Sequence, residues 1–247
     1  MSTDKRSQIS ILGVAVDRVT MREALDRLET LIHKRKPCLV ATANAEMVMV
    51  AQQDKELLAI LNAADLVLAD GAGVVWAASR LGSGVPERVA GFDLTQMLLR
   101  RAAIAGYRVY WLGAAPGVAE IAAGRAAELY PGLITVGIHD GYFPVDELSI
   151  MQTIRETQPD ILLCALGIPK QEKWLSRNLS QLQVPVCIGV GGTFDVMAGK
   201  VKRAPLWMQK SGLEWSYRLI LQPSRIVRML ALPQFVLRVL LAAWTTR

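Results

Sequence analysis

Short apolar runs alternate with helical patterns along residues 9–192, and this alternation constrains the fold of the chain more than any other feature. The runs are rich in Val, Ile and Leu, which is typical of strands covered on both faces. The first helical pattern opens with Thr20 and Glu23, at the spacing of a capping box. The alternation predicts an α/β fold, namely a Rossmann-like, mostly parallel sheet with helices on both faces. The apolar runs cover residues 9–16, 38–44, 66–70, 107–113, 134–138, 160–167 and 184–192, and helices are expected over 20–36, 54–64, 93–106, 116–131, 145–158 and 169–182.

The positive charge of the chain is concentrated at its C-terminal end. The formal net charge is +6, yet from Lys200 onward nine Lys and Arg residues stand against one acid, Glu214, so that segment carries +8 and residues 1–199 carry −2. Because the segment is also strongly apolar, it matches neither an ordinary surface helix nor a buried one. We therefore predict two parts, an α/β domain over residues 1–199 and a basic, amphipathic helical appendage over residues 200–247.

Cysteine usage and the N-terminal segment bear on the compartment. Cys38, Cys164 and Cys187 each lie inside an apolar run without a close-spaced pair, which is typical of core thiols in a reducing compartment. The segment MSTDKRSQIS has no apolar signal core, and no charge-free window reaches the length of a membrane span. The sequence therefore predicts a cytoplasmic protein.

Polar residues and glycines follow one apolar run after another, in the segments TANAE, ADGAG, GAAPG, GIPKQE and GVGGTFD. Taken alone, each segment has an ordinary structural explanation: Asp70-Gly71 fits a turn and helix cap, and GAAPG lacks the full GxGxxG spacing of a dinucleotide site. However, the carboxyl ends of parallel strands meet at one edge of a sheet, where such folds bind ligands. Their joint occurrence therefore predicts a ligand site at this edge.

Several motifs together resemble the WecG/TagA/CpsF family of bacterial glycosyltransferases, in order and at the expected spacing over residues 9–228. The most specific are ADGAG, GIPKQEKW and RAPLW followed by GLEWSYRL. The resemblance implies that residues 1–199 form a catalytic domain. It would transfer a sugar, typically of the N-acetylmannosamine type, from a UDP-sugar to a polyprenyl-diphosphate-linked acceptor at the inner face of the cytoplasmic membrane. The resemblance also implies inversion at the anomeric carbon without a metal or other cofactor, and the chain has no Asp-x-Asp pair of the kind that holds a divalent ion on a nucleotide diphosphate.

The resemblance also assigns residues to roles. Asp70 would be the base that accepts the proton of the acceptor hydroxyl. Thr42 and Asn44 match polar pocket positions that bind the transferred sugar or orient Asp70, and Arg88 matches an arginine that meets acceptor or diphosphate charge. The positions that would bind the donor are Gln171, with Gly113 and Asp195 as weaker candidates for the nucleotide.

For the C-terminal segment, the resemblance implies an appendage that docks over the active site at the membrane and supplies arginines, matched here by Arg218, Arg225 and Arg228. Arginine interleaved with apolar residues favours a membrane surface, with interfacial insertion expected of Phe235, Leu240, Leu241 and Trp244. An oligomer interface is the second interpretation, and an ordinary helix packed on the body is a further alternative. Nucleic acid is a weaker alternative, because the arginines alternate with aliphatic more than aromatic side chains.

Two other functions stay open from the sequence. A nucleotide-dependent oxidoreductase would require a complete GxGxxG and an acid about twenty residues beyond it, and the chain has neither. A non-catalytic, membrane-associated nucleotide-sugar-binding protein remains the alternative to the glycosyltransferase. The particular UDP-sugar, acceptor, polymer and oligomeric state do not follow from the sequence.

Overall fold

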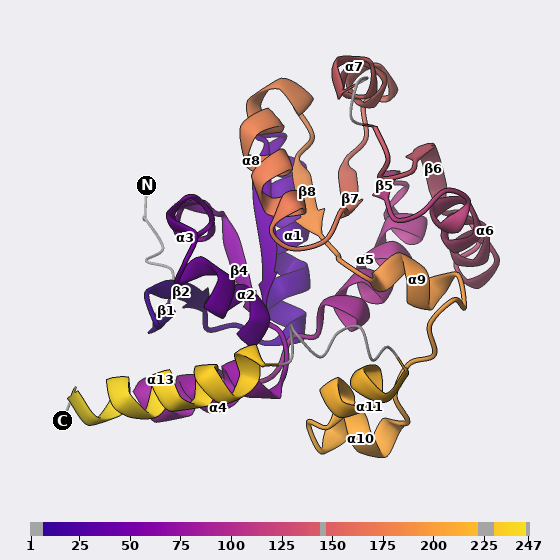
Figure 1. Ribbon diagram of the computed structural model, residues 1–247. Coiled ribbons are helices and arrows are strands. Elements are labelled where there is room, and N and C mark those ends of the chain that lie inside the picture. The colour runs from indigo at the N-terminus through magenta and orange to yellow at the C-terminus, as the bar shows by residue number, and fades with distance from the viewer. Residues whose placement is uncertain (1–6, 144–146, 222–229, 246–247) are drawn as a thin grey trace. The chain divides into compact units, whose positions relative to one another are not determined.

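The structure, a computed structural model, describes residues 7–143, 147–221 and 230–245, without the side chains of Lys210 and Arg218. Its main element is a six-stranded sheet of order β4-β3-β8-β7-β5-β6, flanked by helices (Figure 1). The registered pairs β3–β8, β8–β7, β7–β5 and β5–β6 are all parallel. The predicted α/β fold is therefore confirmed. The strands are β3 Cys38–Ala43, β4 Leu66–Ala69, β5 Arg108–Gly113, β6 Ile134–His139, β7 Ile161–Ala165 and β8 Val186–Gly189.

The first apolar run does not join this sheet, and the prediction of a doubly covered strand there is wrong. It folds into an antiparallel hairpin of β1 (Gln8–Ile11) and β2 (Val14–Asp17). Leu12 and Gly13 both have positive φ, 50° and 86°, which is the backbone of a tight two-residue hairpin turn. The run is therefore two short strands separated by a turn.

The predicted helices are all present, and the capping box is confirmed by its contacts. The Thr20 N–H donates to Glu23 Oε2 at 2.7 Å, and the Glu23 N–H donates to Thr20 Oγ1 at 3.2 Å. The predicted helices are α1 Met21–Lys34, α3 Lys55–Ala63, α5 Gly91–Ala105, α6 Val118–Leu129, α7 Glu147–Thr157 and α8 Lys170–Leu182. The structure adds α2 Ala45–Ala51, α4 Ala72–Leu81 and α9 Thr193–Met197, and in the C-terminal segment α10 Leu206–Lys210, α11 Glu214–Leu221 and α13 Ala231–Thr245.

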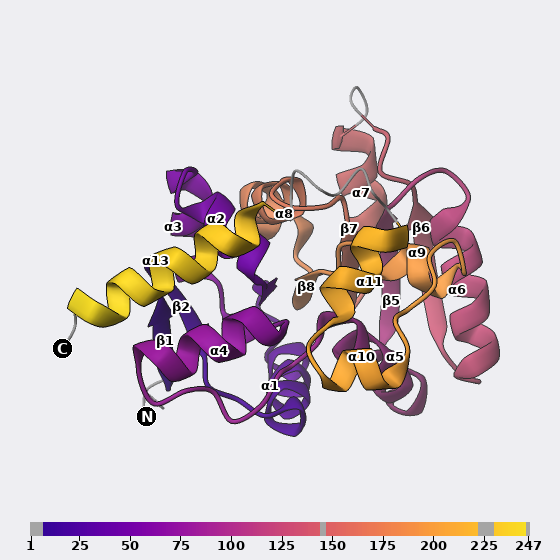
Figure 2. The same ribbon diagram turned by 60° about the horizontal axis from the view of Figure 1, so that its bottom comes forward.

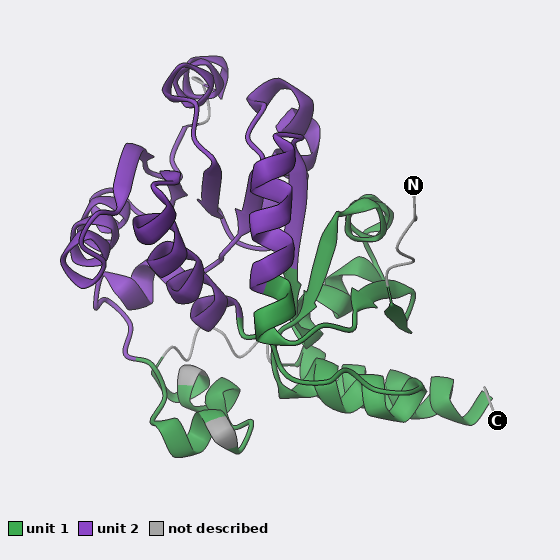
Figure 3. Cartoon of the chain, turned by 180° about the vertical axis from the view of Figure 1, so that it is seen from behind, with its two compact units in different colours: residues 1–24, 42–90, 203–247 green, residues 25–41, 91–202 purple. Residues whose placement is uncertain are grey.

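The chain divides into two compact units (Figure 3). Unit 1 comprises residues 1–24, 42–90 and 203–247, and unit 2 comprises residues 25–41 and 91–202. Residues 203–247 thus group with the hairpin, α2, α3, β4 and α4 in unit 1. The functional division predicted at residue 199 stays a prediction.

Unit 2 has its core on the strands β5, β7 and β8. Trp111 of β5 is fully buried against Phe194 of α9, with ring centroids 5.1 Å apart. The helices α5 and α6 both contact α9, and α7 contacts α8. Cys164 and Cys187 are buried in β7 and β8, where burial raises the pKa of both thiols, so they remain protonated core groups.

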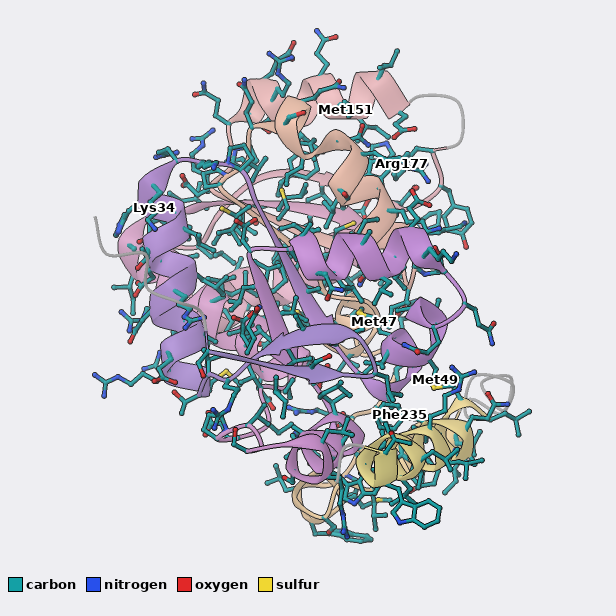
Figure 4. All side chains as sticks on the ribbon, turned by 90° about the vertical axis from the view of Figure 1, so that its left-hand side faces the viewer. Lys34, Met47, Met49, Met151, Arg177 and Phe235 are labelled. Carbon is teal, nitrogen blue, oxygen red and sulfur yellow. The ribbon has the colours of Figure 1, made fainter. Side chains whose placement is uncertain are left out.

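Part of the core of unit 1 lies where α2, α4 and α13 meet. The helix α13 packs along both α4 and α2 (Figure 2). Its buried side chains are Phe235, which is 1% exposed, and Val239; Figure 4 shows Phe235 on this helix and Met49 on α2. Phe235 therefore belongs to the core of unit 1, and the prediction that it inserts into a membrane surface is wrong. Leu240, Leu241 and Trp244 are exposed on the same helix.

Candidate active site

Asp70, Thr42 and Asn44 lie together in unit 1, where β3 and β4 end. The Asp70 N–H donates to the Ala43 carbonyl at 2.8 Å, so Asp70 follows β4 directly beside the last residues of β3. Thr42 is buried with 8% of its surface exposed, whereas Asp70 is half-buried. The sequence predicts these residues at strand ends, and the structure brings the three of them to one place.

The local backbone explains why a glycine follows Asp70. Gly71 has φ 89° and ψ 150°, a conformation that residues with a side chain rarely adopt, and it is the N-terminal cap of α4. The N–H groups of the first turn of α4 therefore begin immediately after the carboxylate-bearing residue. Asp70 thus stands at a strand-to-helix turn, where its carboxyl group is partly accessible.

Asn44 has a structural role as well as a position in the site. Its Oδ1 accepts a hydrogen bond of 2.9 Å from the Met47 N–H and so caps α2. Because Oδ1 is engaged in this cap, the group that Asn44 offers to a ligand is its Nδ2 amide, a hydrogen-bond donor.

Arg88 lies in an ion-pair group with Arg203 of the RAPLW motif and Glu214 of the GLEWSYRL motif. Its Nη1 is 3.7 Å from Glu214 Oε2 in α11, and Glu214 Oε1 is 3.9 Å from Arg203 Nε. All three side chains are partly or largely shielded from solvent, with 16–23% of each exposed. Sequence reasoning missed Glu214 as a functional candidate, although it was the one acid in the basic segment and stands within the GLEW motif.

Of the three tail arginines, Arg218 lies in α11, and its side chain is outside the described part of the structure. Arg225 and Arg228 fall in residues 222–229, which also lie outside the described residues. Their predicted roles therefore remain predictions.

In unit 2, Gln171 ties together the loops that follow β7 and β8. Its Oε1 accepts from the Gly167 N–H at 3.2 Å and the Gly191 N–H at 3.1 Å. Its Nε2 donates to Glu172 Oε1 at 2.7 Å, and both side chains are at most 2% exposed. The two backbone donors fix which end of the amide is oxygen, because a flipped amide would set N–H groups against N–H groups.

Glu172 was not predicted as a site residue, and its environment is unusual. Burial raises the pKa of Glu172 to about 7, although the hydrogen bond from Gln171 lowers it in part. Its Oε2 is buried without a hydrogen-bond partner among the described residues. The pair also requires Gly189 beneath it, because a Cβ at that position would lie 2.5 Å from Gln171 Nε2.

The two weaker nucleotide candidates are placed differently. Gly113 has φ 118°, and a Cβ there would lie 2.5 Å from the Ala165 carbonyl carbon, so close packing on β7 accounts for this glycine. Asp195 is half-buried in the first turn of α9, where its carbonyl accepts from the Lys200 and Val201 N–H groups at 2.9 and 3.1 Å.

A cationic pocket of about 670 Å³ lies in unit 2, at the carboxyl ends of β5 and β7. Lys170, Lys173 and Arg177 line it from one side of α8, together with Trp174, and Glu147 is a carboxylate among the described residues of its wall. Arg177 is seen on α8 in Figure 4. Lys170 belongs to the GIPKQE segment that the sequence placed at this edge, whereas Lys173 and Arg177 were not predicted as site residues, although the spacing of three to four residues puts all three cations on one helix face.

Comparison with known proteins agrees with the motifs. A sequence model described as the glycosyl transferase WecG/TagA/CpsF family matches residues 9–247. The chain belongs to this family. The resemblance drawn from the motifs is thus confirmed, and so is the assignment of the chain as a glycosyltransferase.

Curated relatives of this WecG/TagA/CpsF protein are similar along its whole length. Two from Staphylococcus aureus, of strains NCTC 8325 / PS 47 and MRSA252, are each 32% identical over 244 residues, covering 97% of this chain and 96% of the relative. Both are named N-acetylglucosaminyldiphosphoundecaprenol N-acetyl-beta-D-mannosaminyltransferase. In the described part of the present chain, none of the helices combines the length and the apolar character needed to cross a membrane.

Proposed function

We propose that the protein transfers an N-acetylmannosamine-type sugar from a UDP-sugar to a polyprenyl-diphosphate-linked sugar in the synthesis of a cell-surface polysaccharide. The acceptor and the sugar follow the name of the Staphylococcus aureus relatives. The UDP donor, inversion at the anomeric carbon and independence from metal follow from the family resemblance.

One observation carries the proposal: Asp70 stands at the strand-to-helix turn after β4, beside Thr42 and Asn44 at the end of β3. A carboxylate in this position can accept a proton, while the Asn44 amide can donate a hydrogen bond to a sugar oxygen. Asp70 would take the proton of the acceptor hydroxyl as its oxygen attacks the anomeric carbon. The bond from that carbon to the UDP oxygen breaks, and UDP leaves.

The departing UDP needs stabilisation of its negative charge, which cations and amide groups supply when no metal does so. Arg88, oriented by Glu214, is the proposed cation of unit 1. In unit 2, Lys170, Lys173 and Arg177 line a pocket that can bind an anionic group. The absence of an Asp-x-Asp pair from the whole sequence supports the metal-independent form of the proposal.

The proposed location is the inner face of the cytoplasmic membrane, with the protein bound peripherally. A lipid-linked acceptor requires access to that surface, and the C-terminal segment combines positive charge with exposed apolar side chains. Self-association through the same segment is part of the proposal, because an exposed apolar face favours a partner in the absence of lipid.

The test is release of UDP from a panel of UDP-sugars in the presence of EDTA, with and without a short-chain prenyl-diphosphoryl-N-acetylglucosamine acceptor. We expect acceptor-dependent release by the wild type and a loss of about 100-fold or more in Asp70→Asn, since general-base catalysis contributes about 10²- to 10⁴-fold. The matched control is Asp65→Asn, the same substitution before β4, which should retain activity. Equal release by Asp70→Asn and the wild type would exclude Asp70 as the base, and a requirement for added divalent metal would exclude the metal-independent mechanism.

A further inference from the structure

An apolar groove of about 520 Å³ lies in unit 1, bordered by α4, α11 and α13. Every described residue that lines it has an apolar side chain or is a glycine. Figure 2 shows α4 and α13, two of its three borders, side by side. Trp215 and Val236 remain 44% and 40% exposed on its walls. A cavity this apolar, left open on a folded protein, indicates an apolar ligand or partner.

Small residues keep the groove open. Gly212 has φ 73°, and a Cβ at this position would lie 2.7 Å from the Ala72 Cβ. A Cβ on Gly73 would lie 3.4 Å from the Ala45 Cβ and 3.8 Å from Phe235 Cε1. Larger side chains at these positions would push their neighbours apart or project into the groove. The space therefore depends on the particular residues that form it.

The groove begins next to the proposed base. Ala72 and Gly73, which line it, are the first two residues of α4, and Asp70 and Gly71 immediately precede them. A substrate whose sugar hydroxyl is at Asp70 can therefore extend along α4 into an apolar channel. The acceptor in the name of the relatives has a sugar joined through a diphosphate to a prenyl chain. Its polar end would match Asp70, and its apolar end would match the groove.

We propose that this groove binds the first isoprene units of the acceptor's prenyl chain, an inference that rests on the proposed function. The groove would hold the chain segment next to the diphosphate, while the rest of the chain stays in the bilayer. Burial of each unit stabilises the complex through the hydrophobic effect. Binding of the lipid part then positions the sugar for attack.

The size of the groove favours a prenyl chain over a docked helix. A helix of about 10 Å diameter and 5.4 Å pitch fills roughly 400 Å³ per turn, so the groove would accept only about one turn. One turn offers too few apolar side chains for stable docking of a second copy of this chain. A branched, flexible isoprenoid chain can fill the same space along its length.

The test measures binding of the full-length protein to geranyl, farnesyl and geranylgeranyl diphosphate by equilibrium dialysis, with inorganic diphosphate as the reference. We expect affinity to rise about tenfold with each added isoprene unit until the groove is full. Val236→Asp, which places a charge on the groove wall, should lower the affinity for geranylgeranyl diphosphate at least about tenfold and leave that for inorganic diphosphate unchanged. The control is Leu237→Asp, because Leu237 is 60% exposed on the same helix and does not line the groove.

Affinity that does not increase with chain length would overturn the inference, as would an equal effect of Val236→Asp and Leu237→Asp. Dodecyl diphosphate binding more tightly than farnesyl diphosphate would assign the groove to membrane lipid and exclude the acceptor chain. Because no UDP-sugar is present in the dialysis, the measured affinities do not depend on sugar transfer. Chain-length-dependent binding by a protein that transfers no sugar would overturn the proposed function alone, and transfer without such binding would overturn the groove alone.

Discussion

The buried side chains of Gln171 and Glu172 are a residue-level feature with a measurable consequence. The Glu172 side chain is buried, with 1% of its surface exposed, and its Oε1 accepts a hydrogen bond of 2.7 Å from Gln171 Nε2. Burial raises the pKa of this carboxyl group, and in its neutral form the proton would be on Oε2 because Oε1 already accepts from Gln171. The pair is therefore compatible with a protonated Glu172 that leaves the Gln171 contacts unchanged.

Stability should depend on pH through Glu172. Its pKa rises from 4.5 to about 7 on folding, so Glu172 loses its proton at a lower pH in the unfolded chain than in the folded protein. The free energy of unfolding should therefore fall between pH 4.5 and 7, by up to about 3 kcal/mol at roughly 1.4 kcal/mol per pKa unit. Glu172→Gln keeps an acceptor for Gln171 but cannot ionise. The free energy of unfolding of the variant minus that of the wild type should therefore be larger at pH 8 than at pH 5.

Chemical denaturation at pH 5 and pH 8 measures this difference. The control is Glu128→Gln, the same change at an exposed position of α6 in unit 2, which should shift stability equally at both pH values. A Glu172→Gln variant whose stability relative to the wild type is the same at pH 5 and pH 8 would contradict the buried, neutral carboxyl group.

Residue identities at strand ends were predictable, but their contacts were not. Asp70, Thr42 and Asn44 could be placed at one edge because parallel strands end there, and the structure brings them together. Glu172 and Glu214 both lie in motifs that the sequence singles out, but a motif does not show that the first glutamate is buried and the second ion-paired. Their roles depend on Gly189 beneath the first and on Arg88 and Arg203 around the second.

At the scale of elements, the sequence predicted helices best and failed where one apolar run contained a turn. The six predicted helices are present, because a helix of ten or more residues shows its apolar stripe clearly. Residues 9–16 look like one strand, but Leu12-Gly13 turns the chain back. The pattern of α13 did not reveal which of its many apolar side chains would be buried, because this depends on how α13 packs on α2 and α4.

Phe235 should be the main anchor of α13. It is 1% exposed where α13 meets α2 and α4, and truncation of a buried Phe costs about 3–5 kcal/mol. Phe235→Ala should therefore release α13 and expose the faces of α2 and α4 that it covers. Hydrogen exchange should show faster exchange in α13, α2 and α4. Leu237→Ala, at a largely exposed position of the same helix, should leave exchange nearly unchanged, and similar exchange in both variants would refute the anchoring role.

At the scale of the whole molecule, charge and exposed apolar surface are concentrated in the same C-terminal segment. Residues from 200 onward carry +8, whereas residues 1–199 carry −2. On α13, Leu237, Leu241 and Trp244 are 60%, 54% and 80% exposed, and their spacing puts them on one helix face. Phe235 and Val239, on the opposite side, are buried where α13 packs on α2 and α4. The helix can thus stay packed while its outer face meets a membrane surface.

Binding to anionic vesicles should therefore require both charge and this apolar face. We expect the full chain to bind vesicles that contain phosphatidylglycerol, and binding to weaken in 0.5 M salt, where the screening length falls to about 4 Å. Trp244→Ser should lower the partition coefficient about five- to tenfold, because an interfacial Trp is lost. Ile104→Ser is the matched control, since Ile104 is 77% exposed on α5, far along the chain from the basic segment. If Ile104→Ser lowers binding as much as Trp244→Ser, or if salt has no effect, α13 is not the surface that meets the membrane.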